Sequence, residues 1–253
     1  MGSMLELALT NIGVAITRPI EQAKKLTQYI EMAGGHVISF PLVAISPLDD
    51  YTAFEQVIAD INHYDWILFI SSNAVQNSLP RLIQQGIPQH LQFAAIGPTT
   101  AQSLQTFGVN KVLIPQGRFD SESLLSLPEM QMMQDKKVMI VRGIGGRDVL
   151  ANTLTARGAL VTFAECYQRI NPQTNCQLLA QAYKDGKLQA IVVTSSEAMR
   201  YLLAMAGHAD WLKKISICVN HARVAEQPLQ MGLNVKIAHA PGDEAMLATL
   251  INQ

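Results

Sequence analysis

The chain has 253 residues, of which 49% are hydrophobic and 15% are charged, and its net charge at pH 7 is -1. The apolar fraction supplies a large core and argues against long disorder. The near-neutral charge argues against a basic nucleic-acid binder and a polybasic membrane anchor, and no apolar run approaches the ~20 residues that cross a bilayer. Three cysteines cannot all pair, which is typical of a reduced cytoplasmic protein.

Short apolar segments alternate with amphipathic ones along the chain. Strands are predicted at 11–17, 36–40, 65–70, 93–96, 111–114, 137–142, 159–166, 189–194, 215–219 and 235–238. Helices are expected in most gaps, beginning with Ile20–Gly34, where Ala23, Leu26 and Ile30 share one face. Continuous apolar strands that alternate with helices indicate parallel sheets covered on both faces, the α/β class.

The sequence contains an internal repeat at an offset of 124 residues. Arg18 and Arg142 each end a predicted strand at this spacing, and Ser71-Ser72 and Ser195-Ser196 each follow one. The same offset relates Gly34 to Gly158 and Gly108 to Gly232. A duplicated unit of roughly 110 residues predicts two similar doubly wound, flavodoxin-like domains. Ligands of such folds bind beyond the carboxyl ends of the strands, so the cleft between the domains is the expected site.

Breaks in the pattern fall inside the repeats rather than between them. Pro41, Pro47 and Asp49-Asp50 interrupt the first repeat, and Asn171-Pro172 marks an equivalent point in the second. This placement favours an exchange of elements, in which residues 1–38 join the C-terminal segment.

Four turns that follow predicted strands carry small, hydroxylated or arginine residues. They are Ser71, Ser72 and Asn73; Gly97-Pro98 with Thr99 and Thr100; Gly143 to Arg147, after Arg142; and Thr194, Ser195 and Ser196. Such turns leave backbone N–H groups at helix N-termini, where anions bind, although plain helix capping is the commoner use of such residues at any single turn. Arg18, Arg142 and Arg147 offer bidentate contacts to carboxylate or phosphate, and ordinary surface ion pairs are the alternative.

Tyr167 stands at the end of the predicted strand that begins at Ala159. At the boundary between two lobes its hydroxyl is in position to enter the cleft and donate a proton or a hydrogen bond to a leaving group. The alternative is a packed ring whose hydroxyl contacts water.

Other chemistries have weaker support. Gly143-Ile144-Gly145-Gly146, with Glu165 near the end of the next strand, partly matches a dinucleotide loop, but Asp148 replaces the third glycine of that fingerprint. The six histidines show no zinc spacing, and no P-loop lysine or nucleophile elbow is present. We therefore expect no metal and no organic cofactor.

A series of motifs follows in order along the chain. They are Ile16-Thr17-Arg18-Pro19, Phe69–Val75, Ile96–Ala101, Arg142-Gly143 through Gly146-Arg147, Arg157-Gly158-Ala159 and Tyr167-Gln168-Arg169. In order and spacing these motifs resemble the uroporphyrinogen-III synthase family over roughly residues 12–250. The chain departs from the family at Asn220–Arg223, and Val224 stands about where a second threonine falls. His221 and Arg223 are the candidates to replace that threonine.

The resemblance implies two lobes joined by two linker strands. One lobe holds residues 1–38 and 169–253 and the other holds 43–164, with linkers near 39–42 and 165–168. Closure of the lobes about the linkers would shape the pocket. The implied activity is a cofactor-independent lyase reaction of haem biosynthesis, the cyclisation of hydroxymethylbilane to uroporphyrinogen III with inversion of ring D and loss of water.

The resemblance also assigns roles and partners. Tyr167 matches the family's tyrosine and would assist departure of the hydroxyl group, while the turns and arginines would hold the substrate's carboxylates. A cytoplasmic monomer that acts on a small molecule is expected, with no nucleic-acid or membrane partner and with transient contact to hydroxymethylbilane synthase. The alternative is a non-catalytic two-lobed protein that binds a small polyanion.

Overall fold

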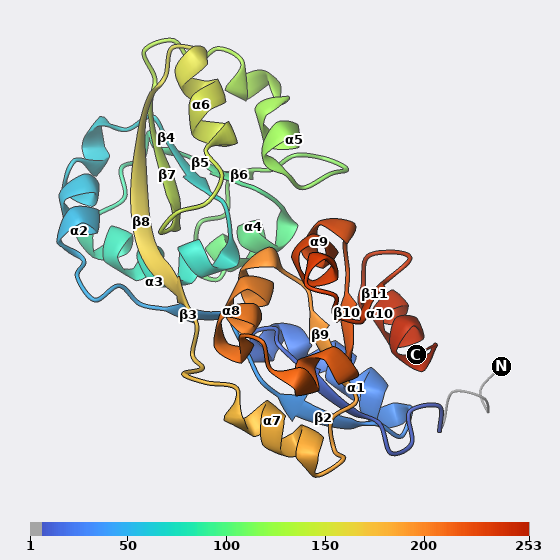
Figure 1. Ribbon diagram of the computed structural model, residues 1–253. Coiled ribbons are helices and arrows are strands. Elements are labelled where there is room, and N and C mark those ends of the chain that lie inside the picture. Colours follow the sequence, from blue (N-terminus) through green and yellow to red (C-terminus); the bar gives the residue numbers. More distant parts are fainter. Residues whose placement is uncertain (1–6, 253) are drawn as a thin grey trace. The chain divides into compact units, whose positions relative to one another are not determined.

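The computed structural model describes residues 7–252, which divide into two units. One unit is discontinuous and holds the described residues 7–44 and 170–252, and the other is continuous and holds Ile45–Arg169. In each unit, strands that pair in parallel form a sheet between layers of helices, which confirms the predicted fold class (Figure 1). Within residues 7–252, none of the helices combines the length and apolar character that crossing a membrane requires.

The discontinuous unit is built on a five-stranded sheet in the order β11-β10-β9-β1-β2. Its strands are β1 (Gly13–Ile16), β2 (His36–Ser39), β9 (Ala190–Val193), β10 (Ser216–Val219) and β11 (Val235–Ile237). Its helices are α1 (Ile20–Met32), α7 (Gln177–Lys184), α8 (Ser196–Ala206), α9 (Ala222–Gln230) and α10 (Asp243–Ile251). Leu26 of α1 and Met246 of α10 pack on one face of the sheet, and Leu202 of α8 and Val224 of α9 pack on the other.

The continuous unit is built on a six-stranded sheet in the order β3-β8-β7-β4-β5-β6. Its strands are β3 (Ala44–Ser46), β4 (Trp66–Phe69), β5 (Gln92–Ala95), β6 (Val112–Leu113), β7 (Lys137–Gly143) and β8 (Leu160–Ile170), where β3 begins one residue before the unit boundary. Its helices are α2 (Thr52–Ala59), α3 (Ser72–Gln85), α4 (Pro98–Gln105), α5 (Ser121–Leu125) and α6 (Val149–Ala156). Leu79 of α3 and Leu104 of α4 cover one face, and Leu124 of α5 and Leu154 of α6 cover the other.

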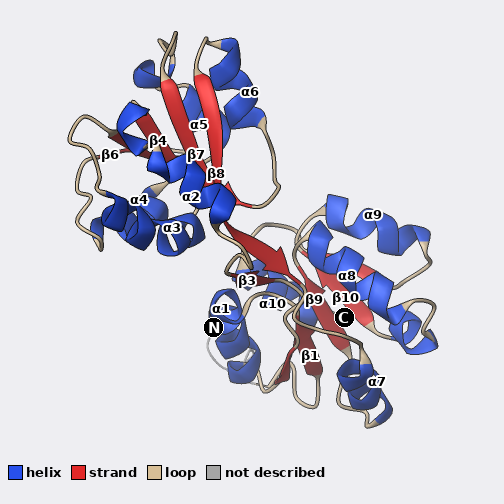
Figure 2. Cartoon of the chain, turned by 90° about the vertical axis from the view of Figure 1, so that its left-hand side faces the viewer, coloured by secondary structure: helices blue, strands red, loops and turns tan. Residues whose placement is uncertain are grey.

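Short 3-10 helices complete the elements at Ile61–His63, Pro128–Met130 and Asp210–Lys214. Figure 2 shows the strands of each unit in red with helices in blue on both sides. Fully buried strand residues such as those of β1, β4, β9 and β10 explain why these segments read as unbroken apolar runs in the sequence.

The internal repeat reappears in the topology, but each folded unit takes strands from both repeats. At the offset of 124 residues, β4, β5 and β6 of the continuous unit correspond to β9, β10 and β11 of the discontinuous unit. Strands β1 and β2 correspond in the same way to β7 and β8. The first repeat therefore supplies two strands to one unit and three to the other, which is an exchange of elements between the duplicated halves.

The boundaries of the two units fall after Ala44 and after Arg169. Strand β2 ends at Ser39, so residues 39–42 lie at and beyond its end. The expected linker strand at 165–168 lies inside β8, which stays paired with β7 as far as Tyr167, and the unit boundary follows two residues later. Pairing with a neighbouring strand thus extends β8 beyond the length that the apolar pattern indicated.

Equivalent serines of the two repeats have the same structural role. Ser71 precedes α3 and its hydroxyl oxygen accepts a hydrogen bond from the backbone N–H of Ala74 at 3.0 Å. Ser195 precedes α8 and accepts one from the N–H of Ala198 at 3.1 Å. Both residues are helix N-caps that satisfy an N–H group that the helix itself leaves unpaired.

Replacing either serine with alanine removes one hydrogen bond from a helix N-terminus. We expect Ser71→Ala and Ser195→Ala each to lower the free energy of unfolding by about 1 kcal/mol, as measured by chemical denaturation. Threonine at either position keeps the hydroxyl and serves as the control. A loss at one position alone would contradict the equivalence of the two caps.

Candidate active site

Each sheet has a point at which the strand order reverses. In the continuous unit it lies between β4 and β7, whose following helices α3 and α6 pack on opposite faces. In the discontinuous unit it lies between β1 and β9, followed by α1 and α8 on opposite faces. Ligands of open α/β sheets bind beyond the carboxyl ends of the strands at such a reversal. The predicted residues Ser71 and Gly143 lie at the first of these points, and Arg18 and Thr194 lie at the second.

A β-bulge in β8 determines the face of the sheet on which Tyr167 lies. In the register of β7 with β8, Arg142 pairs with Glu165 whereas Gly143 pairs with Tyr167, so Cys166 is the extra residue of a β-bulge. Alternate residues of a regular strand share a face, and Tyr167 would then face the same way as Glu165. The bulge instead places Tyr167 beside Cys166 in the core under α2, α3 and α4.

The Tyr167 ring lies directly over the backbone of Gly143. A Cβ at Gly143 would stand 2.5 Å from Cε2 of the ring and 2.6 Å from Cζ, so no larger residue fits without displacing the tyrosine. Across Gly143, the Tyr167 hydroxyl oxygen lies 3.3 Å from Oγ of Ser71. Tyr167 is only 1% exposed, which differs from the expectation of an outward-projecting hydroxyl.

The thiol of Cys166, next to Tyr167 in β8, is buried and unreactive. Cys166 is buried, and burial raises the pKa of its thiol to about 12. Its sulfur lies 3.4 Å from the carbonyl oxygen of Arg142. Because a thiolate is the reactive form, Cys166 has no role as a nucleophile near neutral pH.

Arg142 is held by carboxylates of its own unit. Its side chain is 9% exposed and contacts Asp148 at 2.7 Å and Glu165 at 3.2 Å, with the guanidinium 3.5 Å from the centre of the Phe163 ring. The Glu165 carboxylate also accepts a hydrogen bond from the N–H of Gly145 at 3.2 Å. Glu165 therefore closes the glycine-rich turn, which weighs against the ribose-binding role that a dinucleotide site requires.

Arg18 is paired in the equivalent place. It forms an ion pair with Asp243 at the start of α10, and its Nε donates to Oγ1 of Thr194 at 3.2 Å. Arg147 differs from both, because it is exposed and makes no ion pair within 4.0 Å in the part of the chain that the structure describes. Of the three predicted arginines, Arg147 is the one whose guanidinium is open to an anionic ligand.

The other predicted residues lie where strands pass into helices. Those at least partly open to solvent are Ser72 and Asn73 of α3, Thr99 of α4 and Ser196 of α8. Thr100 is 4% exposed and lies inside the packing of α4, so its hydroxyl does not face solvent as expected.

The turn at Asn220–Arg223 uses a histidine as its cap. The Nδ1 atom of His221 accepts a hydrogen bond from the N–H of Arg223 at 3.1 Å, and α9 begins at the next residue. Val224, which stands about where the family has a second threonine, is buried and has no hydroxyl group to offer at this helix start. The departure from the family pattern is thus accommodated by a different capping group.

Phe119 is a residue that the sequence did not single out. It lies in the loop between β6 and α5 and packs against Gly97, where an added Cβ would stand 2.9 Å from the Phe119 Cβ. Phe119 as a whole remains 52% exposed, which places an apolar side chain beside the N-terminus of α4. A phenylalanine in a loop belongs to no periodic pattern, so the sequence does not predict where it packs. Its position is known only from its close contact with Gly97.

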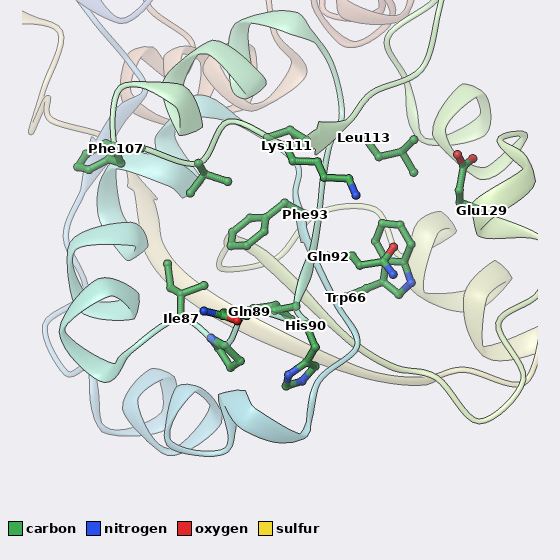
Figure 3. Close-up of a pocket in the computed structure, with 15 residues that line it drawn as sticks. Trp66, Ile87, Gln89, His90, Gln92, Phe93, Phe107, Lys111, Leu113 and Glu129 are labelled. Atoms are coloured by element: carbon green, nitrogen blue, oxygen red, sulfur yellow. The ribbon is translucent and has the colours of Figure 1, made fainter.

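A hollow of about 860 Å³ lies at the opposite end of the continuous unit's sheet, among the amino ends of β4, β5 and β6 (Figure 3). Phe93 and Trp66 both line it, but Phe93 belongs to the core under α3 and α4 and Trp66 to the core under α5 and α6. The hollow therefore follows the edge of the sheet, and none of the predicted site residues lines it. Across residues 7–252, no group of three or more His, Cys, Asp and Glu side chains is arranged to hold a metal ion.

The contact between Gly143 and Tyr167 is open to a direct test. Gly143→Ala forces the ring off the backbone, and we expect a loss of about 1–3 kcal/mol in the free energy of unfolding. In a Tyr167→Ala background the ring is absent and the same change at Gly143 should cost much less. Equal costs in both backgrounds, measured by urea denaturation, would show that the two residues are not coupled.

Comparison with known proteins places this arrangement in one family. The family model described as uroporphyrinogen-III synthase HemD matches residues 24–248. The chain is 33% identical to the uroporphyrinogen-III synthase of Escherichia coli over 245 residues, which cover 94% of this chain and all of that protein.

Solved structures share the fold. A uroporphyrinogen-III synthetase from Helicobacter pylori matches with a TM-score of 0.60 at 15% identity, over 95% of this chain and 99% of that one. A mutant uroporphyrinogen III synthase from Thermus thermophilus matches with a TM-score of 0.58 at 16% identity, over 95% and 96% of the two chains. With a family match over most of its length and a relative aligned from end to end, the chain belongs to the uroporphyrinogen-III synthase family.

Proposed function

We propose that this chain converts hydroxymethylbilane into uroporphyrinogen III, closing the macrocycle with ring D inverted and releasing water. The observation that carries the proposal is the alignment with the Escherichia coli synthase over the whole of that protein. The reaction breaks a carbon–oxygen bond and forms a carbon–carbon bond without net oxidation or reduction. A lyase that needs no redox cofactor accounts for it.

The substrate is a linear tetrapyrrole with eight carboxylates, and a protein of net charge -1 does not attract it by overall charge. Local donors at the carboxyl ends of the strands are the alternative. The backbone N–H groups at the starts of α3 and α4 in the continuous unit, and separately at the start of α8 in the discontinuous unit, suit carboxylates because helix N-termini carry a partial positive charge. The exposed guanidinium of Arg147 supplies a bidentate partner for one further carboxylate.

The first chemical step is departure of the hydroxyl group from the hydroxymethyl substituent of ring A, which leaves an azafulvene cation. A proton donor assists this departure, and Tyr167 is the residue we assign to supply the proton. Attack through the substituted carbon of ring D gives a spiro intermediate, which fragments and recloses with ring D inverted. The proton returns when the last pyrrole regains aromaticity, so the enzyme ends as it began.

The remaining task is conformational. Unassisted closure of the bilane gives the type I isomer, so the protein must hold the chain in the geometry that favours the spiro route. Such control needs many weak contacts rather than one strong base. It fits a site that consists of capped helix ends, Arg147 and the half-exposed Phe119.

The test is a coupled assay on freshly generated hydroxymethylbilane, with uroporphyrin isomers separated by chromatography after oxidation. We expect type III to predominate with the protein and type I without it. Type I alone from folded protein would overturn the proposal and favour a non-catalytic protein that binds a polyanion.

Tyr167→Phe removes the proposed proton source while keeping the ring that packs on Gly143. We expect kcat for type III formation to fall by about 10²-fold with little change in the melting temperature, since general acid catalysis typically contributes 10²–10⁴-fold. Steady-state kinetics and thermal melting measure the two quantities. A variant with undiminished kcat would remove Tyr167 from the chemistry.

A further inference from the structure

The hydrogen bond between Tyr167 and Ser71 has a direction that the surrounding contacts determine. Tyr167 is 1% exposed, and Oγ of Ser71 at 3.3 Å is the only hydrogen-bond partner of its hydroxyl among residues 7–252. A buried O–H without an acceptor costs about 1–3 kcal/mol. The phenol therefore donates its proton to Ser71 rather than accepting one from it.

Ser71 then has one group left over. A serine hydroxyl accepts two hydrogen bonds and donates one. The oxygen of Ser71 accepts from the N–H of Ala74 at 3.0 Å and from Tyr167, so both acceptor positions are occupied. Its own hydrogen has no acceptor among the described residues, and Ser71, unlike Tyr167, is partly exposed.

The position of this free hydrogen is also the position where a ligand is expected. Ser71 follows β4 and caps α3, next to the strand reversal between β4 and β7 (Figure 1). The bulge at Cys166 and the missing side chain of Gly143 hold Tyr167 directly behind it. A ligand bound at this edge would therefore meet Ser71 first, with Tyr167 behind it.

We propose that Ser71 is a second catalytic residue, which hands a proton to the departing hydroxyl group and is reprotonated by Tyr167. The inference rests on the proposed function and changes which residue touches the substrate. As the carbon–oxygen bond of the hydroxymethyl group breaks, the leaving oxygen takes the Ser71 proton and departs as water. Ser71 takes the phenolic proton, and Tyr167 is left as phenolate until the proton released on final aromatisation returns along the same path.

The experiment compares Ser71→Ala, Tyr167→Phe and the double variant by kcat for type III formation. If the two residues act as one relay, each single change lowers kcat by about 10²-fold and the double variant is no slower than either, because residues of one catalytic unit are not additive. Ser71→Thr keeps the hydroxyl and should stay within a few-fold of the unchanged protein. Ser78→Ala, which removes a hydroxyl bonded to the Ala74 carbonyl in the same helix, should leave kcat unchanged.

Loss of the cap in Ser71→Ala must be separated from loss of the relay. Ser71→Gly also lacks the hydroxyl, but glycine is a tolerated N-cap that costs only a few tenths of a kcal/mol. It should lose as much kcat as Ser71→Ala while melting close to the unchanged protein. A kcat that follows the melting temperature across these variants would show a structural role and overturn the relay.

Other outcomes distinguish the relay from the function on which it rests. A slow Tyr167→Phe together with fast Ser71→Ala and Ser71→Gly would mean that Tyr167 acts directly, so the relay fails and the proposed function stands. Multiplying losses in the double variant would also overturn it. In mixtures of H₂O and D₂O, two transferred protons give a curved dependence of kcat on deuterium fraction, whereas a straight line would indicate one proton and contradict the relay.

Discussion

The close approach of the Tyr167 ring to the backbone of Gly143 is the constraint on which the carboxyl end of the continuous unit depends. It requires a glycine at the last position of β7 and a bulge in β8 that turns the tyrosine to the correct face. It also requires a small polar residue at the start of α3 to receive the hydroxyl. Two strands and the start of a helix thus meet through one aromatic ring, and each of these requirements limits the choice of residue at its own position.

The carboxyl ends of the sheets do not form simple cationic pockets, because the arginines at the strand ends are paired with carboxylates. Arg142 and Arg18 stand at equivalent places at the ends of β7 and β1, and both are paired with carboxylates: Arg142 with Asp148 and Glu165, and Arg18 with Asp243 of α10. A nearly buried guanidinium needs a paired charge, so Arg142 helps to fix the turn before α6 and Arg18 helps to fix the start of α10. On the proposed function, recognition of the acidic substrate then depends on oriented backbone N–H groups, which are polar without a net charge, together with the exposed Arg147.

The sequence predicts the fold well, because unbroken apolar strands and the 124-residue repeat are global signals. It predicts the candidate site only in part. Ser71 and Ser195 are recognisable as caps from the sequence. The burial of Tyr167 depends on a β-bulge, and no residue type in β8 predicts that bulge. The ion-pair partners of Arg18 and Arg142 come from other elements or from the following turn. The sequence alone therefore does not distinguish a free arginine at a strand end from a paired one. The strand predicted at 159–166 was found as β8, but its continuation to Ile170 was missed, because this end of β8 passes the pairing with β7 and lies in a strand whose other neighbour is β3.

The exchange of strands between the repeats has a consequence for how the chain folds. The continuous unit, Ile45–Arg169, contains the strands of the six-stranded sheet in one stretch of chain. This segment can therefore form its core as soon as it leaves the ribosome. Strands β1 and β2 must wait for β9, which begins more than 150 residues after β2 ends. Contacts of such high sequence separation form slowly, since loop closure precedes any gain from pairing. During synthesis β1 and β2 are therefore the strands that stay longest without their partner β9, and their apolar side chains remain exposed for that time.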